Sequence, residues 1–262
     1  RDDGYHDLES LVVFTVFGDV IRARPAAELS LDRTGPFAAQ LPENPSDDLC
    51  LRAARDLAAA LGRDAGVALT LEKNIPVAAG VGGGSSDAAA VLRALCHIWQ
   101  VDVDDRQVMQ VATQLGADVP IFVAGKSAFA EGIGEKLTPT TIESSWYLVV
   151  DPQVSVSTAE IFSNPQLTRD SAPIKIPALA ADCVRNDCQN VVEKLHPEVA
   201  KARLWLEQFG TAQLTGTGAC LFAKFATQED AISVLNRIPS DWNGFVAKGT
   251  DKSPTHRQLE QL

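Results

Sequence analysis

Residues 75–89 are IPVAAGVGGGSSDAA, and this stretch carries most of what the sequence says about fold and function. In the segment before it, Val67, Leu69 and Leu71 alternate with other residues, which predicts a half-buried strand. In the segment after it, apolar residues between positions 88 and 99 recur at helical spacing. A strand, a glycine-rich loop and a helix in this order favour a phosphate site, because the N–H groups and the dipole at a helix start attract anions.

The loop between this strand and this helix has little that could keep a ligand away from its backbone. Four of the residues from 80 to 84 are glycine, and Ser85 or Ser86 is expected to cap the first turn of the helix. A merely flexible turn is the alternative for any short glycine run, but the flanking strand and helix favour phosphate binding.

Two common phosphate-binding loops do not fit this sequence. The dinucleotide fingerprint G-x-G-x-x-G would need glycine at position 85, which is Ser85, and the Walker A loop would need a lysine at the helix start. The pattern PxxxGxGGGSSDAA, which begins at Pro76, instead resembles the phosphate-binding motif of the GHMP small-molecule kinases.

Composition narrows the class of protein. The 262 residues are 45% hydrophobic and 22% charged, which is typical of a globular chain with a real core. The net charge of −11 argues against broad nucleic-acid binding and against attachment to an anionic membrane. With no signal peptide and no apolar run long enough to span a bilayer, we expect a cytoplasmic protein. The five scattered cysteines indicate free core thiols, and Cys183 and Cys188 do not predict a zinc site.

The rest of the chain predicts mixed strands and helices. We expect a strand over 11–17 that forms a hairpin with 20–23, and a helix that Asp47 or Asp48 caps and that ends at Leu61. Further helices are expected over 105–115, after a cap at Asn186, from a restart at Pro197 that continues to Phe209, and from a cap at Thr227 to Ile238. Paired strands are expected over 127–137 and 212–224, and single strands over 146–150 and 245–248.

Asp118 allows two interpretations. It follows Gly116, where a helix should end, and precedes Pro120 in the first turn of the next helix, so a simple N-cap is structurally adequate. The alternative is a carboxylate held at a buried junction between elements and ready to accept a proton. Spacing alone does not decide between them.

Five motifs, in order along nearly the whole chain, resemble those of the 4-diphosphocytidyl-2-C-methyl-D-erythritol kinases, a family of GHMP kinases. They are DGYHDL at 3–8, IPVAAGVGGGSSDAA at 75–89, LGADVPIFVAGKSAFAEGIGE at 115–135, NDC at 186–188 and LTGTGAC at 214–220. The DGYH and GADVP elements distinguish this family from homoserine, mevalonate and galactose kinases. The resemblance implies ATP- and Mg²⁺-dependent phosphorylation of the 2-hydroxyl of the cytidylyl substrate in the non-mevalonate isoprenoid pathway.

The resemblance also implies an α+β fold of two domains with the active site in the cleft between them. Residues 1–145 would form the N-terminal ATP-binding domain, and residues 146–262 a ferredoxin-like C-terminal domain. The family begins with a strand that carries a lysine near the catalytic base, whereas this sequence begins at Arg1, so a segment is expected upstream.

Residue roles follow from the same resemblance. Asp118 would be the catalytic base, and Ser86 a Mg²⁺ ligand by analogy only, the metal ligands being otherwise unknown. The residues that would wrap the ATP phosphates are Pro76, Val77, Ala78, Ala79, Gly80, Val81, Gly82, Gly83, Gly84, Ser85 and Ser86. The substrate-binding residues would be Tyr5, His6, Lys73, Thr158, Phe162, Gly216, Thr217 and Gly218.

Tyr5 and Phe162 would stack on the two faces of the cytosine ring, and His6 would bind its polar edge. The expected partner is therefore a small-molecule substrate, with the chain a monomer or a homodimer. Two other functions stay open. Another GHMP kinase acting on a plain alcohol would not cluster these three residues, and a non-catalytic nucleotide-binding relative would lack the upstream lysine.

Overall fold

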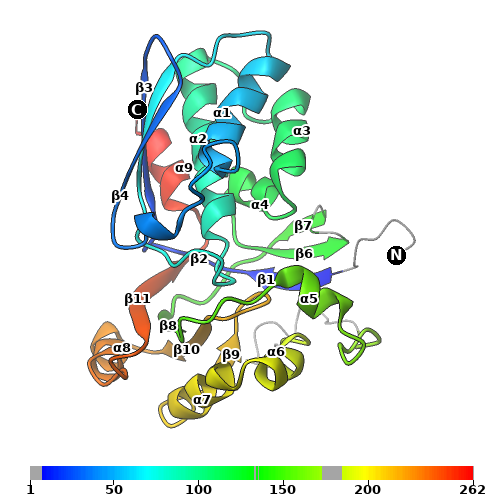
Figure 1. Cartoon of the computed structure of the whole chain (residues 1–262), viewed down its shortest axis with the longest axis vertical. Helices are drawn as coiled ribbons and strands as arrows, with labels where there is room; N and C mark the ends of the chain where they lie inside the picture. Colours follow the sequence, from blue (N-terminus) through cyan, green and yellow to red (C-terminus); the bar gives the residue numbers. More distant parts are fainter. Residues whose placement is uncertain (1–7, 133, 135, 173–184, 262) are drawn as a thin grey trace.

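The computed structural model describes residues 8–132, 134, 136–172 and 185–261 (Figure 1). Tyr5, His6 and Cys183 lie outside these residues. No helix in the described ranges is long and apolar enough to cross a bilayer. The strands are β1 (Leu8–Val12), β2 (Phe14–Thr15), β3 (Val20–Pro25), β4 (Ser30–Thr34), β5 (Val67–Glu72), β6 (Ala128–Gly132), β7 (Lys136–Pro139), β8 (Trp146–Asp151), β9 (Ala212–Leu214), β10 (Leu221–Phe225) and β11 (Asn243–Thr250). The helices are η1 (Ala38–Gln40), α1 (Leu49–Ala60), α2 (Gly83–Trp99), α3 (Arg106–Leu115), α4 (Val119–Ala124), α5 (Thr158–Ser163), α6 (Gln189–Leu195), α7 (Pro197–Leu206), α8 (Gln228–Leu235) and α9 (Pro254–Leu259).

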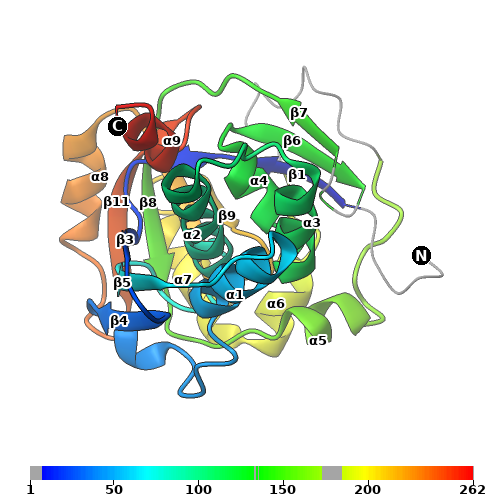
Figure 2. The ribbon, with the colours of Figure 1, turned by 90° about the horizontal axis from the view of Figure 1, so that it is seen from above.

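The first half of the chain packs four helices beside the sheet β3-β5-β4. In this sheet β5 runs antiparallel to β3 and parallel to β4. The alternation predicted for β5 is confirmed, because Val67, Leu69 and Leu71 are buried and the residues between them are only half-buried. Seen from above, α2 lies between this sheet and α4 (Figure 2).

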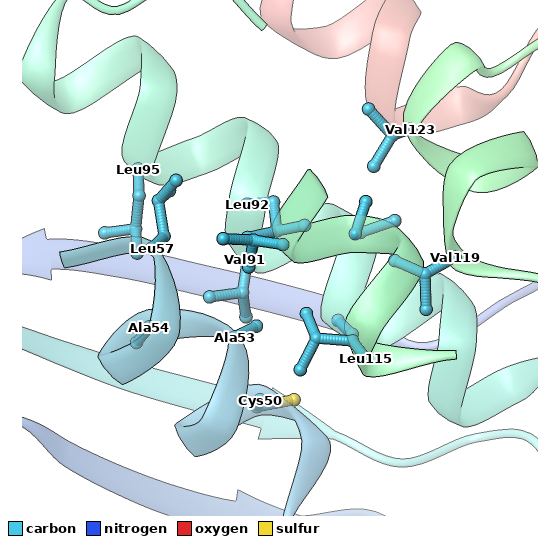
Figure 3. Packing of buried hydrophobic residues seen from close by; sticks show 14 of the residues in the cluster. Cys50, Ala53, Ala54, Leu57, Val91, Leu92, Leu95, Leu115, Val119 and Val123 are labelled. Atoms are coloured by element: carbon cyan, nitrogen blue, oxygen red, sulfur yellow. The ribbon is translucent and has the colours of Figure 1, made fainter. Parts of the chain in front are cut away.

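The core of this half is built from the apolar faces of α1, α2, α3 and α4 (Figure 3). The predicted cap of α1 is confirmed at Asp48, whose carboxylate accepts from the N–H groups of Cys50 and Leu51. The Cys50 sulfur points into the core, and Cys96 and Cys220 are likewise buried free thiols, as expected. Burial of these small and aliphatic side chains fixes α2 in place and so fixes where the glycine-rich loop ends.

The second half forms a five-stranded sheet in the order β2-β11-β8-β10-β9. Its own apolar core lies between β8, β10 and helices α5 to α8, and contains Leu148, Ile161, Val192 and Leu221. The predicted pair of strands over 212–224 is confirmed, because β9 and β10 run antiparallel and are joined by the 215–220 turn.

The predicted hairpin between residues 11–17 and 20–23 is wrong. The first of these segments splits into β1, which pairs with β6, and β2, which pairs with β11, while β3 pairs with β5. The turn at Gly18 and Asp19 does not close a hairpin, because the Asp19 carboxylate binds backbone N–H groups of residues 74 and 75 instead. A side chain with distant partners therefore overrides the local turn signal.

The two halves are joined at both ends of the chain. β2 pairs with β11, and α9 returns to pack on α2 (Figure 1). Next to α9, Ser253 N–H donates to the carbonyl of Gly125 at 3.0 Å. The last residues of the chain therefore lie against the first half. A division at residue 145/146 stays a prediction.

Candidate active site

A cleft of about 2370 Å³ lies between the two halves. It is lined from the first half by Gly80, Gly82 and Asp118, and from the second half by Phe162 and residues 214–218. Pockets for a single small ligand usually enclose about 300–1,000 Å³. The cleft therefore has room for a nucleotide and a second substrate side by side.

The glycine-rich loop enters α2 without a capping side chain. The helix begins at Gly83, and its N-cap is Gly82 in the left-handed region, with a φ of 69°. The predicted cap at Ser85 or Ser86 is wrong, because both lie inside the first turn, where the Ser86 hydroxyl donates to the carbonyl of Gly83 at 3.0 Å. Because no side chain takes the first N–H groups of α2, an outside acceptor can bind them.

The backbone at this helix start has N–H groups that are free to bind an anion. The N–H groups of Gly83, Gly84 and Ser85 have no acceptor among the residues that the structure describes. The 17-residue helix behind them adds the positive end of its dipole. Of the residues predicted to wrap the phosphates, the structure places five on the cleft wall: Ala78, Gly80, Val81, Gly82 and Ser86.

The loop is bonded to the turn between β9 and β10. Thr215 Oγ1 donates to the carbonyl of Gly80 at 3.0 Å, and Cys220 N–H donates to the carbonyl of Ala79 at 3.1 Å. Gly80 has a φ of 75°, and a Cβ there would lie 2.4 Å from the carbonyl oxygen of Thr215. The structure thus brings the predicted Gly216, Thr217 and Gly218 turn directly against the phosphate loop.

Asp118 stands at the N-cap position of α4, directly before Val119, but its side chain does not act as a cap. Its carboxylate makes no cap hydrogen bond, and among the described residues it has no ion-pair partner. The side chain is open to the cleft, yet the surrounding protein displaces enough water to raise its pKa above the ordinary value. An unpaired carboxylate of raised basicity facing a cleft favours the proton-accepting interpretation over the simple cap.

Packing of α4 holds Asp118 close to the phosphate loop. The Phe122 ring lies against Gly82, where a Cβ would be 2.7 Å from the ring. A Cβ on Gly116 would be 3.9 Å from the Ser85 hydroxyl. The contacts on both sides of Asp118 therefore reach the start of α2.

The second half contributes α5 and the turn that faces it. The hydroxyls of Thr158 and Thr217 are hydrogen-bonded at 2.9 Å, and Phe162 lines the cleft one turn further along α5. Asn186 was expected to cap a helix, and its Oδ1 accepts from Cys188 N–H at 2.9 Å just before α6, although α6 itself begins without a side-chain cap. Its Nδ2 also donates to the carbonyls of Leu214 and Gly216, at 2.9 and 2.7 Å. It thus positions the turn that touches the phosphate loop, a role that sequence reasoning missed.

Lys73 lies beneath the loop rather than on the cleft wall. Its ammonium is 2.5 Å from Asp19 Oδ2 and 2.7 Å from Asp87 Oδ2, and its side chain is 1% exposed. Ligand contact by Lys73 stays a prediction, which this burial does not favour.

Sequence reasoning gave Asp19 and Asp87 no role. For Asp87 the missed signal was a carboxylate one turn before Val91 on the apolar face of α2.

We expect Asp87→Asn to change how stability depends on pH. Burial raises the pKa of Asp87 from about 4 to about 7, although Lys73 opposes the shift. When the pKa of a carboxyl group is higher in the folded than in the unfolded state, the free energy of unfolding falls as pH rises between these two pKa values. The fall is about 1.4 kcal/mol per pH unit. Asn mimics the protonated form, so the variant should gain on the order of 2 kcal/mol relative to the parent between pH 5 and pH 7. Chemical unfolding of both proteins across this range measures the gain, and parallel curves would contradict it.

Comparison with known proteins gives the family. Residues 48–126 match the family model of the GHMP kinases N terminal domain, and residues 175–244 match that of the GHMP kinases C terminal. Over 264 aligned residues that include the whole chain, it is 46% identical to the 4-diphosphocytidyl-2-C-methyl-D-erythritol kinase of Halorhodospira halophila (strain DSM 244 / SL1), of which it covers 91%. It is 48% identical to the kinase of the same name from Pseudomonas aeruginosa (strain LESB58), of which it covers 92%.

Structural comparison agrees with the sequence matches. A crystal structure of 4-(cytidine 5'-diphospho)-2C-methyl-D-erythritol kinase superposes with a TM-score of 0.78 at 29% identity, over 95% of this chain and 92% of that one. The expected α+β fold of two GHMP-kinase domains is thereby confirmed. The chain belongs to the 4-diphosphocytidyl-2-C-methyl-D-erythritol kinase family of the GHMP kinases.

Proposed function

We propose that this chain transfers the γ-phosphoryl group of ATP to the 2-hydroxyl of 4-diphosphocytidyl-2-C-methyl-D-erythritol, giving the 2-phosphate and ADP. One observation carries the chemistry. The unpaired carboxylate of Asp118 lines the same cleft as Gly82 and Ser86, which flank three N–H groups that have no acceptor among the described residues. We infer the substrate from the name of two relatives, both called 4-diphosphocytidyl-2-C-methyl-D-erythritol kinase, which are 46–48% identical to this chain.

In this mechanism Asp118 accepts the proton of the substrate hydroxyl as that oxygen attacks the γ-phosphorus. Desolvation favours this step, because it makes the carboxylate a stronger base than an exposed aspartate. The N–H groups of residues 83–85 neutralise charge on the phosphates and hold them in line with the attacking oxygen. Proximity of α4 to the loop supplies the geometry that phosphoryl transfer needs.

Mg²⁺ would enter with the nucleotide. The described residues contain no group of three His, Cys, Asp or Glu side chains that could hold a metal ion on their own. Mg²⁺ commonly binds through substrate phosphates plus only one or two protein ligands, so the cleft fits a metal that arrives on the triphosphate. There it would neutralise charge on the phosphate oxygens.

Specificity for the cytidylyl group is assigned to the α5 side of the cleft. Phe162 lies there on the cleft wall and would stack on one face of the pyrimidine. Tyr5 and His6, which lie outside the described residues, would supply the second face and the polar edge contact. A plain alcohol substrate would gain nothing from these groups.

Turnover assays test the proposed function. ADP release with ATP and Mg²⁺ should require 4-diphosphocytidyl-2-C-methyl-D-erythritol and should be absent with homoserine or mevalonate. Turnover of a plain alcohol at a similar rate would instead support another GHMP kinase, and nucleotide binding without any turnover would support a non-catalytic relative.

Phe162→Ala should raise KM for the cytidylyl substrate about tenfold while leaving KM for ATP unchanged, because a stacked ring contributes about 1–3 kcal/mol.

A further inference from the structure

A buried charge cluster, formed by Asp19, Lys73 and Asp87, lies at the base of the phosphate loop. These three residues come from the segment before β3, the end of β5 and the first turns of α2. Their side chains are 1%, 1% and 4% exposed, so none of them presents a charge to the solvent. A buried ion cluster of this kind seldom adds stability over an apolar core, but it can fix one conformation.

The cluster holds the loop at its beginning. While Asp19 Oδ2 binds the Lys73 ammonium, Asp19 Oδ1 accepts from the N–H groups of Asn74 and Ile75, at 2.6 and 2.9 Å. These are the second and third residues after β5, next to Lys73 itself. One carboxylate therefore fixes both the side chain and the backbone at the point where the loop leaves the sheet.

The same cluster holds the loop at its end. Asp87 is the fifth residue of α2, one turn beyond the N–H groups that would bind phosphate. A Cβ on Gly83 would lie 3.1 Å from the Lys73 ammonium, which places the ammonium directly beneath the helix start. Burial lowers the pKa of Lys73, but the two carboxylates outweigh this and raise it, so the ammonium keeps its charge.

We infer that Asp19 and Lys73 are positioning residues that fix the two ends of the phosphate loop and thereby set the affinity for nucleotide phosphates. They act through the loop and not by contact, because both side chains are buried while residues 83–85 present the free N–H groups. The inference rests on the proposed nucleotide-binding function.

Calorimetric titration with ADP and with adenosine, both with Mg²⁺, tests the inference on the full chain. Asp19→Ala removes the acceptor of Asn74 and Ile75 while leaving a balanced Lys73–Asp87 pair. It should weaken ADP binding about tenfold, because the donors of the anion site lose their alignment, and should leave adenosine binding within about twofold. Asp19→Asn keeps an oxygen acceptor and should lose less affinity for ADP than Asp19→Ala does.

Asp48→Ala is the matched control. Asp48 is also buried, accepts from two backbone N–H groups and pairs with Arg33 at 2.7 Å, but it caps α1. This variant should lose thermal stability and yet bind ADP within about twofold of the parent. An equal loss of ADP affinity in the Asp48 and Asp19 variants, or an equal loss of adenosine affinity in Asp19→Ala, would overturn the inference.

Hydrogen exchange of the unaltered chain gives a second measurement that needs no variant. Residues 74 and 75 should exchange slowly without nucleotide, because Asp19 already binds their N–H groups, and fast exchange there would overturn the inference. A parent chain that binds ADP but does not turn over the cytidylyl substrate would sink the proposed function alone. A parent chain that does not bind ADP would sink both.

Discussion

Asp118→Asn should lower kcat by about 10²–10⁴, the usual contribution of a general base. The substitution keeps the size of the side chain but removes the carboxylate that is open to the cleft. KM for ATP should stay within about threefold, because in the proposed mechanism the phosphates bind to the N–H groups at the start of α2 and not to Asp118. Steady-state ADP release with the cytidylyl substrate gives both constants.

The pH dependence of kcat supports the same assignment. The pKa of Asp118 is raised by desolvation, and the base must be ionised to act, so kcat of the parent should fall on acidification, beginning above the ordinary range of an aspartate. In Asp118→Asn this fall should disappear from the residual rate. A residual rate that keeps the full acid limb would assign the titration to another group.

Asp105 provides the matched control for this substitution. It occupies the same position of α3 that Asp118 occupies in α4, but its carboxylate does cap the helix, accepting from Gln107 N–H at 2.7 Å. Asp105→Asn should leave kcat unchanged, since Asn is also a good N-cap. If Asp118→Asn retained kcat as well, Asp118 would be only the residue at which α4 begins.

Local pattern predicted the elements around this site well. The alternation before the loop gave β5, helical spacing gave α2, and the pair Asp47 and Asp48 gave the start of α1, which Asp48 caps. Each of these signals lies within a few residues of what it predicts, because burial follows the period of the element. The position of the glycine-rich loop at the start of α2 was predictable for the same reason, since loop and helix are adjacent in sequence.

Long-range partners were not predictable from local pattern. Asp19 looked like part of a hairpin turn, but its partners are 54 to 56 residues away. Asn186 was expected only to cap a helix, but besides accepting from Cys188 N–H it holds the turn around Gly216, 30 residues on. In both cases the polar side chain satisfies distant backbone groups, a choice that depends on tertiary packing and leaves no mark in the neighbouring sequence.

Gly80→Ala should weaken ADP binding and lower kcat/KM for ATP about a hundredfold. Two effects combine, because the φ of 75° disfavours any side chain and the added Cβ would lie 2.4 Å from the carbonyl oxygen of Thr215. The Thr215 oxygen and the nearby Gly218 atoms are backbone atoms, which cannot rotate away as a side chain would. Either the loop or the β9–β10 turn must shift, and a displacement of about 1 Å at a reacting centre commonly costs about 10²-fold in rate.

Gly62→Ala separates strain from displacement. Gly62 has a φ of 61°, but an added Cβ there would meet nothing within 4 Å. This variant should lose about 1 kcal/mol of unfolding free energy from backbone strain alone, with kcat/KM for ATP unchanged. Thermal unfolding and steady-state kinetics of both variants then show whether the loss of kcat/KM comes from backbone strain or from displacement of the loop. Equal kinetic effects in the two variants would mean that close packing between the loop and the β9–β10 turn does not set the phosphate site. A large effect confined to Gly80→Ala would mean that the two halves of the chain position the nucleotide together, through the contact between Gly80 and Thr215.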